Sequence, residues 1–440
     1  MSVEVTPIRT AAEAALASAF AAAALPGGAA VARERKSAFE MFERTGLPHR
    51  RIEEWKYTDL RALMRDAKPL APPPDARAKE RAKSAGAIVS GVAAHRMVFV
   101  DGSYVQKLSD TALEPGVTVT SLSAALAAGQ GIDGRAVEGS GAADDPVFAL
   151  NTAFMTDGAL IRVARNTQAA KPIHLVFVHS GTAATATFTR SQVVVEEGAQ
   201  LTLIESHEGP DALDYQVNAA LELDVADDAH LEHVKLACEG NGALHVATLI
   251  AALGARASLN AFTYTLGGAV SRNQLFVRCG GKGADVTIAG VNLLRRKEHA
   301  DLTLVLDHAV GGCTSREILK SVLDDESRGV LQGRIVVRQD AQKTDARMLM
   351  RALLLSQEAE ADHKPELEIF ADDVQCGHGS TAGELDKNLK FYLMARGIPE
   401  PEAEALLIQA FIGEAVETVR HQGLRDALMF ASGRWLGSRT

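Results

Sequence analysis

Cysteine and aromatic residues are scarce in this chain of 440 residues. Its cysteines form no Cys-x-x-Cys pair, and a chain of this length does not need disulfide bonds to stabilise its core. They indicate free thiols in a reducing compartment, so we expect a cytoplasmic protein. Only 5% of the residues are aromatic although 47% are hydrophobic, which predicts a mainly aliphatic core. The four cysteines are Cys238, Cys279, Cys313 and Cys376.

An excess of positive charge and the common catalytic motifs are also missing. The formal net charge is −10, and a protein that binds phosphate backbones normally carries a basic face, so we expect no nucleic acid partner. The sequence contains no P-loop, no Gly-x-Ser-x-Gly elbow and no His-Glu-x-x-His motif. Residues 129–134 match Gly-x-Gly-x-x-Gly, but they follow a predicted helix instead of a strand and are interpreted as a loop. We therefore expect a protein that is not an enzyme.

Residues 14–31 carry no charge, yet they do not have the character of a membrane span. Alanine dominates this stretch, and Pro26-Gly27-Gly28 interrupts it. We therefore expect a surface helix here and no association with a membrane.

The distribution of helix and strand formers divides the chain into four parts. Residues 1–95 are predicted to be an N-terminal helical region, and residues 96–160 a mixed linking segment. Residues 161–380 contain short apolar or alternating strands between turn residues, and residues 381–440 are predicted to be a C-terminal helical domain.

A short motif recurs within residues 161–380, in which a turn residue and usually an alanine precede an alternating strand. Its starts are spaced by about 26–30 residues, with a shorter last interval. Strands this close together leave no room for a helix in every crossover, so the pattern favours a parallel β-helix whose stacked coils share one core. A β-sandwich is the alternative that the residues alone leave open. The motif begins at Gly198, Asp228, Gly254, Gly283 and His299.

Three helices are predicted after the strands. Thr381 and Glu384 have the spacing of a capping box, which predicts that the first helix starts there and ends at Gly397. Pro399 opens a second helix with an apolar stripe, and a third covers about residues 424–436.

The strongest candidate for metal binding is the string Gln375-Cys376-Gly377-His378. Residues two apart on a strand point to the same face, so the Cys376 thiolate and the His378 imidazole could jointly hold a soft or borderline metal. The alternative is a buried cysteine beside a histidine that caps the next helix. The residues alone leave both interpretations open.

The remaining histidines and cysteines give weaker signals. His230 and His233 would lie on opposite faces of one strand. His299 and Asp301 would share a face and are interpreted as ordinary surface residues of a solenoid. Three cysteines have apolar or glycine neighbours and are expected to pack in the core, while a role in carrying sulfur is left open: Cys238, Cys279 and Cys313.

Several strings in collinear order resemble the SufD family of iron–sulfur cluster assembly proteins, the paralogues of SufB. The resemblance is dense over residues 145–420 and looser before them, where Trp55-Lys56-Tyr57-Thr58-Asp59-Leu60 matches. The most specific block is Asp372-Asp373-Val374-Gln375-Cys376-Gly377-His378-Gly379, because SufB-like chains carry a different block at this place. Further matching strings are residues 149–154, 157–158, 314–317, 328–330, 341–346, 353–356, 364–369, 391–393 and 396–398.

This resemblance implies a right-handed parallel β-helix between N-terminal and C-terminal helical regions. It implies a non-catalytic scaffold subunit that pairs with a SufB paralogue and docks the SufC ATPase on its C-terminal helices. His378, with Cys376 beside it, would face SufB and contribute to a transient iron–sulfur cluster, and no cofactor would be bound tightly by the isolated chain. A homodimer of the isolated chain through the same contact is a further expectation.

Two other functions are compatible with a β-solenoid. A carbohydrate-active enzyme would need two carboxylates in a cleft, and the neighbouring Asp372 and Asp373 would face opposite ways on a strand. A generic protein-binding solenoid would usually be exported, which the N-terminal residues do not support.

Overall fold

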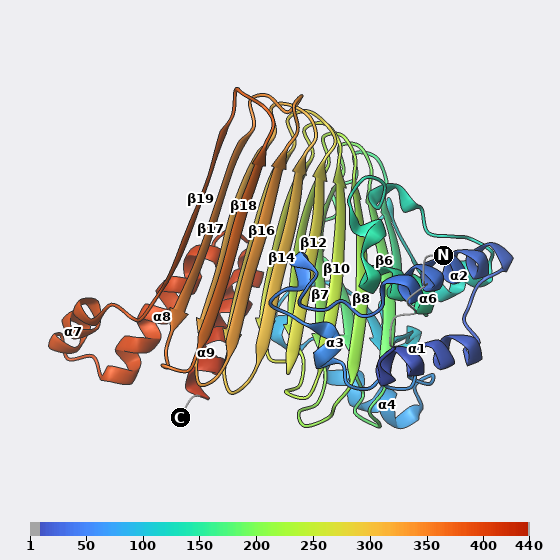
Figure 1. Cartoon of the computed structure of the whole chain (residues 1–440), viewed down its shortest axis with the longest axis horizontal. Coiled ribbons are helices and arrows are strands. Elements are labelled where there is room, and N and C mark those ends of the chain that lie inside the picture. Colours follow the sequence, from blue (N-terminus) through green and yellow to red (C-terminus); the bar gives the residue numbers. More distant parts are fainter. Residues whose placement is uncertain (1–8, 439–440) are drawn as a thin grey trace, which may run out of the picture.

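The computed structural model describes residues 9–438. Its centre is a parallel β-solenoid in which the chain alternates between two sheets, so that each coil adds one strand to each sheet (Figure 1). Helices precede and follow the strands along the chain, which confirms the predicted fold class.

In each sheet the strands follow one another from the last coil of the solenoid to the first. The ten-stranded sheet contains β19 (Gln375–Gly383), β17 (Asp345–Leu354), β15 (Thr314–Leu323), β13 (Asp285–Leu294), β11 (Ser258–Leu266), β9 (His230–Cys238), β7 (Gln200–Glu208), β5 (Ile173–Val178), β1 (His95–Val100) and β2 (Ser103–Tyr104). The nine-stranded sheet contains β18 (Glu360–Ile369), β16 (Arg328–Val337), β14 (His299–His308), β12 (Val270–Cys279), β10 (Leu244–Leu253), β8 (Gln216–Val225), β6 (Ala186–Val195), β4 (Ala159–Val163) and β3 (Val117–Ser121).

Strand pairing is parallel and in register through the coils. Leu304 of β14, for example, lies between Leu275 of β12 and Gly333 of β16. Antiparallel pairs among the described strands are confined to the start of the solenoid, between β1 and β2 and between β3 and β4. A β-sandwich is therefore wrong for this chain, and equivalent residues of successive coils stack into columns.

This stacking explains the sequence repeat and its irregular last interval. The motifs that start at Gly198, Asp228, Gly254 and Gly283 precede β7, β9, β11 and β13, which are consecutive neighbours in one sheet. His299 begins β14 in the opposite sheet. Its interval is shorter because it spans part of a coil instead of a whole one.

Each repeated turn places a residue with left-handed backbone before a small buried residue. The left-handed position is occupied by Gly198, Asp228, Arg256 and Gly283, whose φ angles lie between 56° and 72°. The next residue in each turn is a buried alanine, because the chain reverses towards the interior and a small side chain fits the corner. These alanines are Ala199, Ala229, Ala257 and Ala284.

The interior between the sheets is mainly aliphatic, as the low aromatic content predicts. Full burial of one such side chain stabilises the fold by about 1.5–3 kcal/mol before entropic costs. At one corner, the last residues of six stacked strands form a buried column, here called the corner column. Its members are Val195, Val225, Leu253, Cys279, His308 and Val337.

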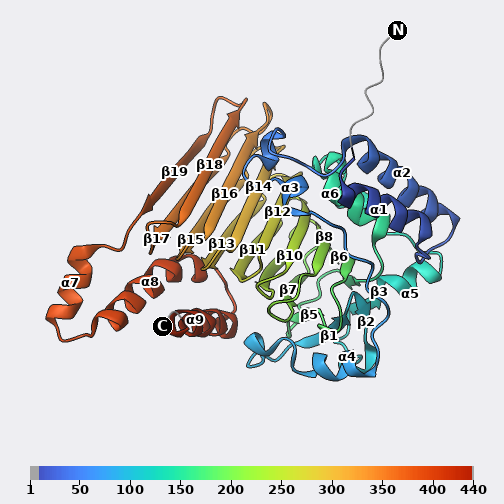
Figure 2. The ribbon, with the colours of Figure 1, turned by 60° about the horizontal axis from the view of Figure 1, so that its bottom comes forward.

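Helices cover the outer faces of the two sheets at different places (Figures 1 and 2). Near the N-terminus, α1, α2 and α6 pack Phe39 and Phe154 against Phe188 of the nine-stranded sheet. Near the C-terminus, α8 and α9 pack against the ten-stranded sheet around Phe262 and Val291. Within residues 9–438 no helix combines the length and apolarity that crossing a membrane requires. The α-helices are α1 (Ala11–Ala22), α2 (Ala29–Thr45), α3 (Leu60–Leu63), α4 (Ala76–Arg81), α5 (Leu122–Ala127), α6 (Pro146–Phe154), α7 (Lys387–Ala395), α8 (Glu400–Val416) and α9 (Gln422–Gly437).

The segment that contains Trp55 and Thr58 anchors the N-terminal region to the nine-stranded sheet. Thr58 Oγ1 bonds to His299 Nε2 at 2.9 Å and donates to Asp301 Oδ2 at 2.5 Å. Asp301 also pairs with Arg272 at 2.5 Å, and the Arg272 guanidinium stacks 3.8 Å from the Trp55 ring centroid. The interpretation of His299 and Asp301 as surface residues is therefore wrong, because the N-terminal segment covers them.

The start of the first C-terminal helix differs from the prediction. The capping box predicted at Thr381 does not form, because β19 continues to Gly383 and Thr381 pairs with Arg351 of β17. The helix α7 follows Asp386, whose carboxylate accepts hydrogen bonds from two backbone N–H groups of the first turn. The predicted end of this helix is confirmed, since Gly397 has a φ of 88°.

Candidate functional site at the open end of the solenoid

The last strands of the two sheets, β18 and β19, form one end of the solenoid, here called the open end (Figures 1 and 2). In the part of the chain that the structure describes, β18 has only β16 as a sheet neighbour and β19 has only β17. The backbone groups on the other side of each strand therefore have no strand partner. Unpaired edges of this kind are templates for pairing with another chain.

Cys376 and His378 lie on β19 with their side chains on the inner face. Cys376 is opposite Ala346 and His378 is opposite Met348, and both partners are buried in the interior core. The shared face expected from the spacing is thus observed. Cys376 is half-buried against the core, whereas His378 is exposed because no further coil covers it. Burial raises the pKa of the Cys376 thiol.

The facing strand β18 adds a second imidazole. His363 Nδ1 lies 2.9 Å from the hydroxyl of Ser380, which is two residues beyond His378 on the same face of β19. The Nε2 atom of His363 is buried without a hydrogen-bond partner, and burial lowers the pKa of the His363 imidazole. The open end therefore combines a thiol, imidazoles and a hydroxyl, which suit a borderline metal ion. Within residues 9–438, the groups of three potential metal ligands that lie close together do not include residues of the open end. The open end of one chain therefore does not supply a full coordination shell.

The adjacent carboxylates of the specific block do not form a catalytic pair. Asp372 and Asp373 are exposed in the turn before β19. Asp373 is bound in an ion pair with Lys343. The paired carboxylates that a glycosidase needs in a cleft are not formed by these residues.

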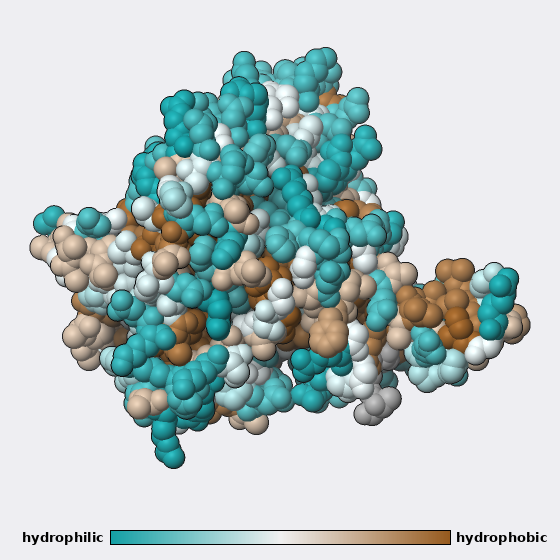
Figure 3. All heavy atoms as spheres, turned by 180° about the vertical axis from the view of Figure 1, so that it is seen from behind, coloured by the Kyte–Doolittle hydropathy of each residue, from teal (hydrophilic) through white to brown (hydrophobic). Residues whose placement is uncertain are grey.

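The helix α7 projects from the body and buries none of its residues (Figures 1 and 2). Its exposed apolar side chains include Phe391, which is 72% exposed, and Leu389 and Tyr392. Figure 3 shows hydrophobic residues gathered on this projection. We call α7 and the start of α8 the arm. Lys390 of α7 forms ion pairs with Glu400 and Glu404 of α8 at 2.9 and 3.0 Å, which holds the two helices of the arm together.

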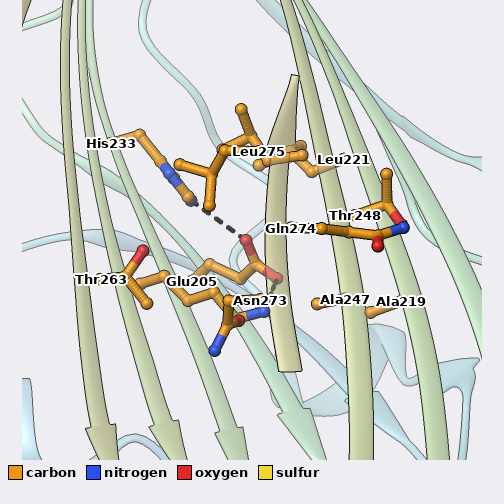
Figure 4. A pocket seen from close by; sticks show the side chains of 12 residues that line it. Glu205, Ala219, Leu221, His233, Ala247, Thr248, Thr263, Asn273, Gln274 and Leu275 are labelled. Atoms are coloured by element: carbon orange, nitrogen blue, oxygen red, sulfur yellow. Dashed lines mark hydrogen bonds and ion pairs between the residues drawn. The ribbon is translucent and has the colours of Figure 1, made fainter. Parts of the chain in front are cut away.

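A polar chamber occupies the interior at β7 to β10, far along the solenoid from β19. Glu205 accepts a hydrogen bond from His233 at 3.0 Å (Figure 4). It also accepts one from His207 at 2.6 Å, and Lys235 Nζ lies 4.0 Å from the carboxylate. Burial alone would raise the pKa of Glu205, but Lys235 and the two imidazoles outweigh burial and hold it well below its usual value. His230 and His233 both lie on β9. His230 is exposed and His233 is buried, which confirms that their side chains point to opposite faces of the strand.

The chamber is a closed network with little free space. Lys235 Nζ lies 3.1 Å from His245 Nε2, and His245 Nδ1 lies 3.0 Å from Glu239. The adjoining cavity is about 20 Å³, the size of one water molecule. We interpret this network as a buried structural element, because its charged groups pair with one another and only a neutral ring nitrogen, His233 Nδ1, is recorded in it without a hydrogen-bond partner.

Two of the remaining cysteines lie together. Cys279 and Cys313 are fully buried, as the prediction of core packing requires, but they adjoin the imidazole of His308. Hydrogen bonding from Cys279, with a further contribution from His308, lowers the pKa of the Cys313 thiol to about 5. The sequence reasoning missed this cluster because Cys279 and Cys313 are 34 residues apart. The signal that could have found it is the repeat, in which Cys313 takes the place of the buried alanine.

Comparison with known proteins places most of the chain in one family. Residues 177–411 match the family described as SUF system FeS cluster assembly, SufBD core domain, and residues 26–175 match the SufBD protein N-terminal region. The chain is 33% identical to the iron–sulfur cluster assembly protein SufD of Escherichia coli over 89% of this chain and 90% of that protein.

Similarity extends to photosynthetic organisms. A SufBD family protein of Synechocystis is 31% identical over 90% of this chain and 89% of its own length. Protein ABCI7, chloroplastic, of Arabidopsis thaliana is 31% identical over 53% of this chain and 50% of its own length. Both family models are matched in the order in which the structure places the N-terminal region and the solenoid. The chain therefore belongs to the SufD family of iron–sulfur cluster assembly proteins, within the wider SufBD group.

Proposed function

We propose that this chain is a non-catalytic scaffold subunit of a SUF complex, which pairs with a SufB paralogue and docks the SufC ATPase. In this proposal the open end is the contact with SufB, and His378 helps to hold iron and sulfide while a cluster forms. The observation that carries the proposal is the open end itself, where unpaired strand edges surround an inward-facing thiol and imidazole.

Pairing through the open end would continue both sheets into a second solenoid. A partner with the same fold offers edges of matching spacing, so backbone hydrogen bonds could run on from β18 and β19. The exposed apolar residues Ile369 and Phe370, at the end of β18, would become buried in such a contact. The same edges explain why a homodimer is expected when the paralogue is absent.

The incomplete ligand set supports a site that two chains share. Cys376 and His378 supply two ligand types suited to iron, whereas a stable mononuclear or cluster site needs more. A thiolate from the partner would add the missing soft ligand. Iron and sulfide are cargo in this scheme, and the role of this chain is to position His378, with Cys376 beside it, at the junction.

The arm is the proposed docking surface for the ATPase. The apolar side chains of Leu389, Phe391 and Tyr392 are 53–72% exposed, and α7 buries none of its residues within the described chain. The helix α8 runs from the arm into the body, where Ile408 and Ile412 pack against the ten-stranded sheet. Closure of two ATPase subunits on ATP binding would therefore move a helix that is firmly attached to the sheet, and the solenoid contact would be reshaped.

Co-expression with the SufB and SufC proteins of the same organism tests the proposal. We expect a stable complex that is recovered by affinity capture of this chain and that builds a cluster on anaerobic reconstitution with iron and sulfide. His378→Ala should leave the complex assembled but reduce cluster absorbance strongly. His230→Ala, which changes an exposed histidine of β9 distant from the open end, is the matched control and should behave as the unmodified chain. A normal cluster yield in His378→Ala would refute the assigned role, and a chain that captures neither partner would refute the scaffold proposal.

A further inference from the structure

Three potential metal ligands replace the usual apolar residues at one corner of adjacent coils. The corner column is aliphatic at Val225, Leu253 and Val337 but contains Cys279 and His308 in two successive coils. Cys313 follows Gly312, whose φ is 74°, and thus takes the turn position that alanine occupies in earlier coils. The parallel register brings these three residues to the same corner, although no short sequence motif joins them.

The geometry of this corner fits a metal ion. One ligand atom from each of Cys279, His308 and Cys313 lies within 4.8 Å of the others. Tetrahedral Zn²⁺, with bonds of about 2.0–2.3 Å, places its ligands about 3.4–3.8 Å apart. Binding would therefore draw the three atoms together by at most about 1.4 Å, which small rotations of the side chains can supply.

His308 has a nitrogen that the protein leaves unused. The side chain is fully buried, and Nε2 bonds to the Ser315 hydroxyl at 3.2 Å, but Nδ1 has no hydrogen-bond partner. A buried polar atom without a partner costs about 1–3 kcal/mol, so a ligand on Nδ1 would stabilise this position. A metal ion would satisfy Nδ1, and the hydroxyl would orient the ring from the other side.

The second cluster of three potential ligands provides a contrast. His207, Glu239 and His245 are equally close together, but their ligand atoms already bond to one another and to neighbouring side chains. That cluster belongs to the closed network of the polar chamber. Of the two clusters in residues 9–438, only the one at the corner combines two thiols with an imidazole nitrogen that lacks a partner.

We propose that Cys279, His308 and Cys313 bind one divalent transition-metal ion of borderline character, such as Zn²⁺ or Fe²⁺. Two thiolates neutralise a divalent cation, so the complete site adds no net charge to the aliphatic interior. Sulfur and imidazole nitrogen are the donors that these ions prefer over Mg²⁺ or Ca²⁺. Three protein ligands leave a fourth position for water, which is the arrangement of an exchangeable site.

The ion has a short route to this site. Cys313 is buried, but it directly follows Gly312, which is exposed in the turn between β14 and β15. Gly280 and Gly281 follow Cys279, and the Gly281 carbonyl oxygen lies 3.5 Å from Cys313 Sγ. Because the site lies within one chain, the inference does not depend on the proposed function. It replaces the expectation that the isolated chain binds no metal tightly.

Titration of the purified, reduced chain with Co²⁺ under anaerobic conditions tests the site, because thiolate ligands give a cobalt charge-transfer absorption in the near ultraviolet. We expect saturation at one equivalent and displacement by Zn²⁺. Cys313→Ala and His308→Val restore residues that the repeat and the corner column use elsewhere, so both variants should fold. Each should lower Co²⁺ affinity by at least about 10-fold. Zn²⁺ should raise the unfolding temperature of the unmodified chain but not of Cys313→Ala.

Two control variants separate this site from the other thiols. Cys238→Ala and Cys376→Ala should keep both the absorption and the stoichiometry. The inference is overturned if the unmodified chain gives no thiolate absorption, if the absorption survives Cys313→Ala, or if Cys376→Ala removes it instead. Loss of cluster assembly in a SUF complex plays no part in these readouts, so failure here and failure of the proposed function are distinguishable.

Discussion

The ion pair between Asp301 and Arg272 should contribute more to stability than any exposed pair of the solenoid. Both side chains are at most 1% exposed, and they lie 2.5 Å apart across neighbouring coils. Asp301→Ala would leave the buried Arg272 guanidinium without a carboxylate, with the Glu54 carbonyl, the Gln274 side-chain oxygen and the face of the Trp55 ring as its neighbours. Breaking a buried pair from one side typically costs about 3–5 kcal/mol. The lost hydrogen bond from Thr58 adds about 1 kcal/mol.

Replacing both partners should cost much less than the sum of the single changes. In the double variant Arg272→Met with Asp301→Leu, no uncompensated charge stays buried. The hydroxyls of Thr58 and Thr303 and the Glu54 carbonyl each lose a partner, at a cost of about 1 kcal/mol per group. Gln332 and Gln274 lose only long contacts of 3.4 and 3.5 Å. The two single changes together should cost about 6–10 kcal/mol, so the coupling energy should exceed about 3 kcal/mol.

Urea unfolding followed by circular dichroism and tryptophan fluorescence measures these differences. Trp55 is one of two tryptophans and stacks on Arg272, so its fluorescence also reports local detachment of the N-terminal segment. The exposed pair of Glu197 and Arg165, with a similar 2.5 Å contact across coils, is the matched control. Glu197→Ala should leave the unfolding midpoint nearly unchanged. Additive costs in the buried pair, or an equal effect in the exposed pair, would refute the reasoning.

Three further predictions concern the arm, a buried carboxyl and a tight turn. The double variant Leu389→Ser with Phe391→Ser should leave the unfolding midpoint unchanged, because α7 buries no residue. It should abolish capture of SufC, and undiminished capture would contradict the proposal that the arm is the docking surface. Burial raises the pKa of Glu317 from 4.5 to about 8. Between these two pH values the folded chain retains a proton that the unfolded chain releases, so the free energy of unfolding falls as the pH rises from 4.5 to about 8. Glu317→Gln should therefore be more stable than the unmodified chain by about 3–5 kcal/mol at pH 8 and nearly equal at pH 4.5 in urea unfolding, and a constant difference would contradict this account. Gly281→Ala should cost about 1–3 kcal/mol, because its Cβ would lie 2.0 Å from a backbone nitrogen, whereas Gly131→Ala, which meets nothing within 4 Å, should be neutral in the same assay.

The fold follows from local patterns that the sequence displays directly. Alternating strands and turn residues recur through the solenoid, with a buried alanine in several successive coils, and a chain with that period can bury its apolar faces only by stacking. The ends of the C-terminal helices followed from Gly397 and Pro399, because these residues restrict the backbone wherever they occur. The capping-box prediction at Thr381 failed because pairing with β17 extends the strand, and local spacing does not report a tertiary pairing of this kind.

The candidate site was determined in part by the sequence and in part by the tertiary structure. The two-residue spacing of Cys376 and His378 is enough to place them on one face, since strand geometry alone fixes that relation. That this face is the open end, with β18 opposite and no further coil, required the order of strands in both sheets. The burial of Asp301 and the hydrogen bond to His299 required the N-terminal segment to fold back across the sheet. His308 and Cys313 flank one turn, but Cys279 lies a whole coil earlier in the chain, and only the parallel register of neighbouring coils brings its thiol to the other two ligand atoms.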